Sequence, residues 1–190
     1  MSFFIWLEST AVSEWVRGSP SLWGFPFILY LHTLGLALIA GLSSAVALSI
    51  IALPGPPRRP PLAGLFPLMW VGLGINALSG TALLIAYPAK ALTNPVFYLK
   101  LVAIAVAVGI VYWLERQFAA MPARAAPAGA AADGNPASST GVAPDLALAS
   151  ANGLRRAAWS LLGLWLLATT TGRLLAYTHS ILLASFAEFL

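Results

Sequence analysis

Four long apolar segments dominate the chain, and short or more polar stretches separate them. They cover residues 26–53, 65–87, 96–114 and 157–186. A transmembrane helix needs about 20 mostly apolar residues to cross a hydrocarbon core of about 30 Å. A spanning segment must also satisfy its own backbone hydrogen bonds, and none of the four shows the alternation of a barrel strand. The pattern predicts an all-α fold: a transmembrane, up-down four-helix bundle that forms a single membrane domain over residues 1–190.

The stretches between these segments have the composition of chain breaks. Residues 54–61 are mostly proline with two arginines, and residues 88–95 form a short connection. Residues 119–152 are rich in Ala, Pro, Gly and Ser, and this composition cannot build a packed core. We expect residues 119–152 to be a flexible cytoplasmic loop.

The first 18 residues differ from the four apolar segments. Apolar side chains recur there at helical spacing, whereas Glu8, Ser9 and Ser13 are polar. Glu8 and Glu14 also interrupt the apolar run that a cleavable signal peptide would need. Residues 1–18 are therefore expected to form an amphipathic helix on the outer membrane surface. The alternative is an N-terminal helix packed on the bundle.

Composition agrees with a chain embedded in lipid. Hydrophobic residues make up 59% of the sequence and charged residues 8%, whereas typical soluble domains carry about 25% charged residues. So few charges cannot cover a water-facing surface, which argues against a soluble enzyme. The absence of cysteine excludes disulfides, iron–sulfur clusters, thiolate zinc sites and covalently attached c-type haem.

The basic residues indicate the orientation of the chain. They form no stripe of the kind that binds nucleic acid. Six arginines lie at one set of segment ends: Arg58, Arg59, Arg116, Arg124, Arg155 and Arg156. The positive-inside rule places these ends in the cytoplasm. We expect a multi-pass protein of the bacterial inner membrane, surrounded by lipid, with both termini in the periplasm and no nucleic-acid partner.

The only two histidines, His32 and His179, lie inside apolar segments. At a rise of 1.5 Å per residue, His32 lies about 39 Å from Arg58 and His179 about 35 Å from Arg156. Both histidines therefore reach nearly the same level, near the outer edge of the hydrocarbon. The first and last helices are neighbours in an up-down bundle. An ionisable residue inside a membrane is a functional hypothesis by default.

Two facing imidazoles suit a b-type haem, because its iron takes axial ligands from opposite sides and needs no cysteine. A flat macrocycle requires small residues beside it, and basic residues in the outer half of the bundle can pair with its propionates. Another small stripe, Gly72, Asn76 and Gly80, lies in the second segment. With His32 and His179 as metal ligands, the predicted haem site also includes Gly35, Gly172, Ala176, Arg173 and Lys100. A quinone is a further candidate cofactor.

The same residues can also be explained by helix packing alone, without a cofactor. Small residues at four-residue spacing are ordinary in membrane helix packing, and a histidine there can simply bond to a neighbouring helix. The three dispersed methionines give little support to copper, and zinc lacks further ligands. No phosphate-binding loop or Ser/His/Asp set is present.

Two functions follow from these alternatives. The first is a non-catalytic electron-transfer subunit of an oxidoreductase complex, which relays electrons between the quinone pool and a protein partner. The second is a cofactor-free structural or assembly subunit of a larger membrane complex. A small transporter or channel is disfavoured because the sequence has no internal repeat.

Two short motifs also carry a resemblance. They are residues 31–35 (LHTLG), followed by Gly41, and residues 94–100 (NPVFYLK). On these motifs and their order, the chain resembles an uncharacterised family of small bacterial integral membrane proteins with about four helices. Its architecture is also similar to that of cytochrome b-type membrane anchor subunits, which is an analogy of fold alone. The resemblance implies fold and topology and carries no activity.

Overall fold

A computed structural model describes residues 10–18, 21, 23–52, 61–121 and 144–187. Within the helices, the side chains of residues 11–13, 17, 61, 89–90, 144–148 and 176–187 lie outside the described set. So do the first half of the predicted N-terminal helix, the break at 53–60 and residues 122–143 of the predicted loop. The part of the chain that is described consists of helices and turns without a strand, which confirms the all-α class.

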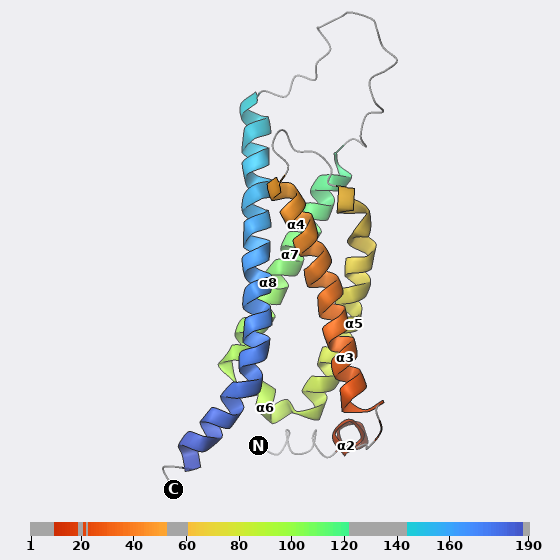
Figure 1. Ribbon diagram of the computed structural model, residues 1–190, viewed down its shortest axis with the longest axis vertical. Coiled ribbons are helices and arrows are strands. Elements are labelled where there is room, and N and C mark those ends of the chain that lie inside the picture. Colours follow the sequence, from red (N-terminus) through yellow and green to blue (C-terminus); the bar gives the residue numbers. More distant parts are fainter. Residues whose placement is uncertain (1–9, 19–20, 22, 53–60, 122–143, 188–190) are drawn as a thin grey trace, which may run out of the picture.

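The helices follow one another along a rod-shaped molecule (Figure 1). The π-helical turn η1 interrupts the first long helix, and the 3₁₀ turn η2 precedes the second. The elements are α2 (Ala11–Gly18), α3 (Phe25–Leu36), η1 (Ala37–Gly41), α4 (Leu42–Ala52), η2 (Pro61–Leu65), α5 (Phe66–Ala86), α6 (Pro88–Leu92), α7 (Pro95–Ala119) and α8 (Pro144–Ala187).

Three helical stretches are long and apolar enough to cross a membrane. They are Phe25–Ala52, Leu62–Ala86 and Pro95–Ala119, with mean hydropathies of 2.3, 1.7 and 2.1. These stretches match the first three predicted segments. The fourth predicted segment lies within α8, which has 44 residues.

Helix α8 begins earlier than the sequence pattern predicts. Residues 144–152, expected to belong to the flexible loop, are helical. Pro144 occupies the first helical position, where proline costs no hydrogen bond. This local signal favours a helix start despite the polar composition.

The first long helix changes its packing partner half-way along. Its first part, α3, packs on α5, whereas α4 packs on α8, and η1 between them still contacts α5. A π-helical turn interrupts the regular α-helical geometry. Directly after it, the Ser43 hydroxyl donates to the carbonyl of Ile39 at 2.6 Å. The interruption lies where the helix passes from one partner to the next.

Two glycines set the close approach of α3 and α5. A Cβ atom on Gly35 would lie 2.5 Å from the backbone nitrogen of Asn76 and 2.7 Å from the carbonyl oxygen of Gly72. A Cβ atom on Gly72 would lie 2.5 Å from the Cβ of Leu38. Neither position has room for a side chain, so the two backbones are nearly in contact.

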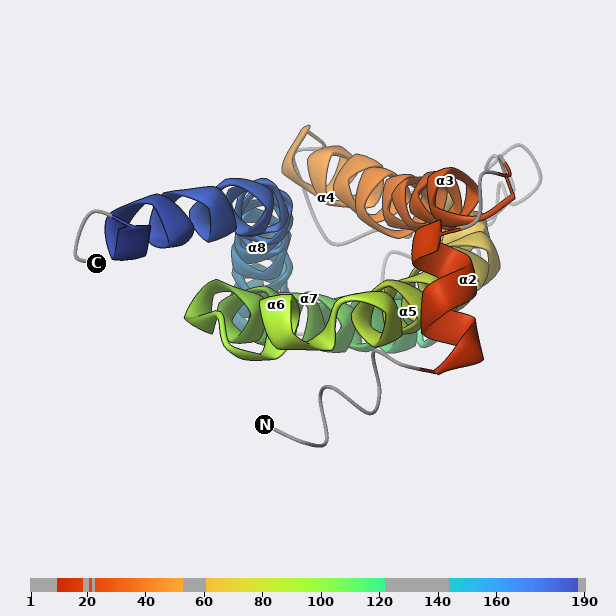
Figure 2. The ribbon, with the colours of Figure 1, turned by 90° about the horizontal axis from the view of Figure 1, so that it is seen from below.

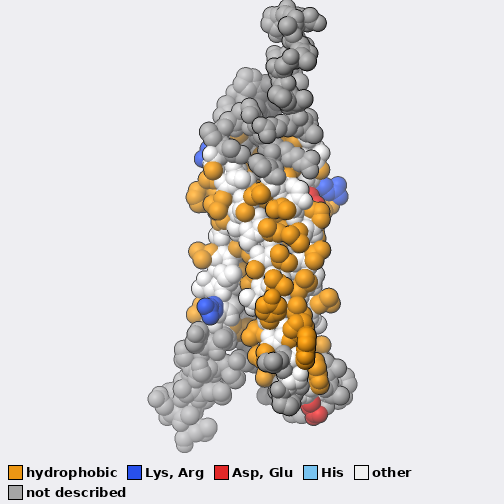
Figure 3. All heavy atoms as spheres, turned by 45° about the vertical axis from the view of Figure 1, so that its right-hand side comes forward, with side chains coloured by type: hydrophobic (Ala, Val, Ile, Leu, Met, Phe, Trp, Pro, Cys, Tyr) orange, Lys and Arg blue, Asp and Glu red, His pale blue; other side chains and the backbone are white. Residues whose placement is uncertain are grey.

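The packed core and the exposed surface are both apolar. Val46, Val111 and Leu161 come from α4, α7 and α8 and are each 1% exposed or less. Leu78 and Leu166 are 77% and 70% exposed. Figure 3 shows hydrophobic side chains along the length of one face, with charged side chains toward its two ends. Such a surface suits lipid rather than water.

The short helices α2 and α6 lie at one end of the molecule, the end that also holds the C-terminal part of α8 (Figures 1 and 2). Helix α2 packs on α5 and buries Val16, whereas Glu14 and Trp15 are exposed. The helix therefore has one face on the bundle and one face turned away from it.

Candidate functional site

His32 lies on α3 and faces α5. Its Nδ1 atom lies 3.1 Å from the backbone oxygen of Asn76 and 3.2 Å from the hydroxyl oxygen of Ser79. In return, the Asn76 side-chain amide donates to the backbone oxygen of His32 at 2.8 Å. These bonds join residues 44 positions apart in the chain and fix the ring against α5.

The bonding partners determine the tautomer of His32. A carbonyl oxygen can only accept, so Nδ1 must carry the hydrogen that it shares with Asn76. The Ser79 hydroxyl donates to the carbonyl of Ile75 at 2.6 Å, so its oxygen is an acceptor toward His32. In a neutral imidazole the other nitrogen, Nε2, then keeps a free lone pair. Nε2 has no hydrogen-bond partner within the described part of the chain.

Gly80 provides the space in which the ring lies. A Cβ atom at Gly80 would come within 3.0 Å of Cε1 and 3.3 Å of Nδ1 of His32. The stripe of Gly72, Asn76 and Gly80 therefore serves the α3–α5 contact and the imidazole. Ser79 also contacts the imidazole, and the sequence analysis did not single it out. The available signal was its position three residues after Asn76, on the same face of the helix.

Lys100 lies on α7 and faces α8. Asn94 caps α7 by accepting from the backbone nitrogen of Val96 at 2.9 Å, and Pro95 occupies the first helical position. This start places Lys100 in the second turn, half-buried, with Nζ 3.6 Å from the position that a Cβ of Gly172 would take. Gly172 thus makes room for the lysine side chain.

Lys100 and Gly172, two residues that the sequence assigns to one site, therefore lie next to each other across the α7–α8 contact. Arg173, the next residue after Gly172, is exposed.

The remaining predicted site residues fall into two groups. The backbone of α5 occupies the space next to Gly35, so this glycine serves the packing of α3 on α5. Ala176 and His179 belong to α8, but their side chains lie outside the described residues. The position of the His179 imidazole relative to His32 stays a prediction.

The arrangement of the helices limits how His32 on α3 and His179 on α8 can share a ligand. The first and last long helices contact each other through α4, whereas α3 and α8 share no extensive contact among the described residues. Figure 2, from the end that carries α2, shows α8 apart from the α3–α5 pair. Any group that joins His32 to α8 must lie between helices that do not pack directly.

Metal ligands are sparse in this region. Among the side chains that the structure describes, no three His, Cys, Asp or Glu residues come together in a way that could hold a metal ion. A haem needs at most two axial ligands from the protein, because the porphyrin supplies the other four.

Known proteins supply no further identification. The resemblance to small bacterial four-helix membrane proteins therefore stays a prediction. No protein-family model matches the chain, and no curated protein or solved structure matches it either.

Proposed function

We propose that the chain is a membrane electron-transfer subunit that holds one b-type haem, with His32 and His179 as axial ligands. The observation that carries the proposal is the anchoring of His32 Nδ1 to the carbonyl of Asn76, which leaves Nε2 without a hydrogen-bond partner among the described residues. Metal-ligating histidines commonly donate their other ring N–H to a carbonyl or carboxylate, and this bond fixes the tautomer and the ring orientation. His32 is held in that way before any ligand is added.

The packing around His32 supports the same proposal. A macrocycle between two helices keeps them apart, and α3 and α8 are not in extensive contact within the described residues. The half-buried Lys100 ammonium would pair with a propionate carboxylate. Bound haem would supply one-electron chemistry at the iron. The chain's own residues would orient the ligand ring, bind the carboxylates and exclude water.

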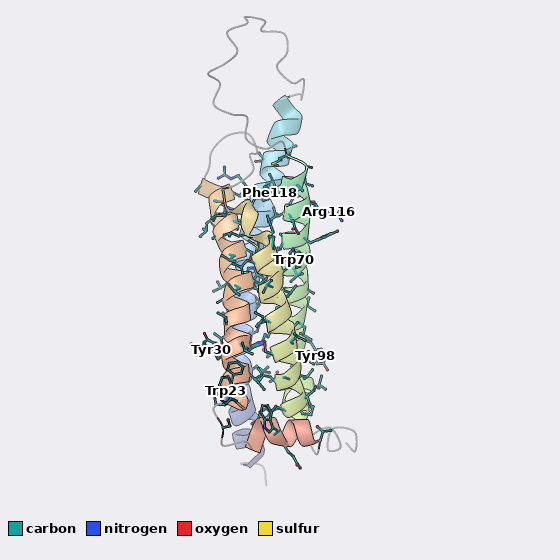
Figure 4. All side chains as sticks on the ribbon, turned by 90° about the vertical axis from the view of Figure 1, so that its right-hand side faces the viewer. Trp23, Tyr30, Trp70, Tyr98, Arg116 and Phe118 are labelled. Atoms are coloured by element: carbon teal, nitrogen blue, oxygen red, sulfur yellow. The ribbon has the colours of Figure 1, made fainter. Side chains whose placement is uncertain are left out.

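The proposed membrane placement has four passes, with α8 as the fourth and α2 on the outer surface. Aromatic side chains near the two ends of the bundle support two interfacial levels. Trp23, Tyr30 and Tyr98 lie toward one end of the bundle, and Trp70 lies toward the other (Figure 4). His32 is two residues beyond Tyr30, about 3 Å deeper along the helix. The haem would then lie near the periplasmic face, and electron transfer from it requires a redox partner protein or a quinone.

The orientation is testable with two reporters. We expect alkaline phosphatase fused after Leu190 to be active and a green fluorescent protein fused there to be dark, because the C-terminus is proposed to be periplasmic. The same fluorescent protein inserted between residues 122 and 143 should be bright. A bright C-terminal fusion with a dark insertion would reverse the proposed orientation.

The haem is tested by a reduced-minus-oxidised visible spectrum of the purified full-length protein. We expect a b-type signal that His32→Gln and His179→Gln remove. Glutamine at position 32 can still donate to the Asn76 carbonyl, so the α3–α5 contact is preserved while the iron ligand is lost. Ser79→Ala is the matched control: it removes one acceptor, leaves the Asn76 bond, and should keep the signal with a shifted midpoint potential. A colourless, folded wild-type protein would refute the proposal.

A second function, a cofactor-free structural or assembly subunit, is favoured by one observation. The reciprocal bonds between His32 and Asn76 also form a complete lock between α3 and α5. Under this function the spectrum is featureless, and His32→Gln changes only the stability of the protein.

A further inference from the structure

A cavity of about 300 Å³ lies at the end of the bundle away from His32. It is formed where η2 and the start of α5 meet the last turns of α7. Phe66 and Phe118, 4% and 1% exposed, contribute a tilted ring pair with centroids 6.2 Å apart. The end that holds this cavity carries the Phe118 label in Figure 4.

One carboxylate, that of Glu115, lines the cavity. It is half-buried, and its Oε2 atom accepts a hydrogen bond from the indole nitrogen of Trp70 at 2.9 Å. Glu115 is also the only acidic residue between Glu14 and Asp133 in the sequence. Glu115 is therefore the one acidic residue in the three long apolar helical stretches, and it lies near the end of the third.

No cation within the described residues neutralises Glu115. The adjacent Arg116 is turned to Tyr112, with its guanidinium carbon 5.0 Å from the ring centroid and a hydrogen bond to the phenolic oxygen. The indole donor of Trp70 bears no formal charge. A partly buried carboxylate of this kind is stabilised by a cation that also donates hydrogen bonds.

The chemistry of the cavity selects the kind of cation. An ammonium group forms charge-assisted hydrogen bonds to a carboxylate and is attracted to the faces of aromatic rings. A ligand group that carries only negative charge, such as free phosphate or a carboxylate, would be repelled by Glu115. Calcium and magnesium require several oxygen ligands, and Glu115 is the one carboxylate among the described lining residues.

We propose that this cavity binds a primary ammonium group, as carried by the headgroup of phosphatidylethanolamine or by a free amine. Trp70 and Tyr112 lie beside Glu115 as interfacial aromatic residues, at the level where lipid headgroups are found. The site is separate from His32 and does not depend on the proposed haem.

The test is native mass spectrometry of the purified full-length protein, with phosphatidylethanolamine and phosphatidylglycerol as competing lipids of equal chain length. We expect the wild-type protein to retain phosphatidylethanolamine preferentially. Glu115→Gln should lower that preference about tenfold, because the charge is lost while the side-chain oxygen can still accept from Trp70. Glu14→Gln, at the exposed acidic residue on α2, is the matched control and should leave the preference unchanged.

A steric variant separates binding from folding. Gly64 lines the cavity, and a Cβ atom added to it would meet nothing within 4 Å. Gly64→Leu should therefore block the cavity without a backbone clash. Gly74→Leu, also with nothing within 4 Å but outside the cavity lining, is its control.

Free ethanolamine distinguishes the two sources of the ammonium group. If millimolar ethanolamine displaces the lipid from the wild-type protein, the site accepts a free amine; if it does not, the site requires the lipid. Equal retention of the two lipids by the wild-type protein, with no displacement by ethanolamine, would overturn the proposal. So would a preference for phosphatidylethanolamine that survives both Glu115→Gln and Gly64→Leu.

Discussion

Gly35→Ala is expected to destabilise the protein by about 2–3 kcal/mol, the upper part of the usual range for overpacking. The added Cβ would lie 2.5 Å from the backbone nitrogen of Asn76 and 2.9 Å from its Cα. These are backbone atoms of α5, so no side chain can rotate away to make room. Helices α3 and α5 would have to separate, and the bonds between His32 and Asn76 would lengthen with them.

Gly74→Ala is the control for this prediction, because Gly74 also lies on α5 and an added Cβ meets nothing within 4 Å. It should be neutral or stabilising by up to about 1 kcal/mol, the difference in helix propensity between the two residues. Both variants can be unfolded by detergent titration and followed by tryptophan fluorescence. Equal unfolding midpoints would show that the close approach at Gly35 is not needed for stability.

Phe118→Ala is expected to cost about 3–5 kcal/mol, the range for removal of a buried aromatic ring. Phe118 is 1% exposed and lies at the end of α7 against Phe66 of α5, with ring centroids 6.2 Å apart. Its truncation leaves a void in the contact that joins these two helices. Detergent titration of the purified protein measures the loss.

The matched control is Trp113→Ala on the same helix. Trp113 is 40% exposed, so its truncation removes fewer contacts within the bundle. We expect a clearly smaller loss of stability than for Phe118→Ala. The prediction is wrong if Trp113→Ala lowers the stability of the protein more than Phe118→Ala does.

Several features of the fold follow from short stretches of sequence. Length and hydropathy predict the three apolar helices Phe25–Ala52, Leu62–Ala86 and Pro95–Ala119, because crossing lipid is a requirement on each segment by itself. The start of α7 is equally local, since Asn94 and Pro95 cap it within one turn. Composition was less reliable at the start of α8. It predicted a loop for residues 144–152, whereas the helix begins at Pro144, a residue that favours the first helical position.

The candidate sites required more than local pattern. The sequence identified His32 and Asn76 as polar residues within spans, but their mutual bonds join residues 44 positions apart. Ser79 also lies against the imidazole, and its only signal in the sequence was its position three residues after Asn76. Trp70 and Glu115 likewise meet across 45 positions. Such pairs depend on which helices pack and at which rotation.

The sequence by itself determined that this chain is helical, which segments are apolar, and that its few ionisable groups are exceptional. Those properties depend on composition and on hydrogen bonding within single segments. Only the tertiary structure decided that His32 faces α5, that Lys100 lies against Gly172, and that Glu115 lines a cavity. The physical reason is that a helix with apolar residues on all sides has no face marked for a particular neighbour. Glycine contacts and the turn at Ala37–Gly41 then select the partners.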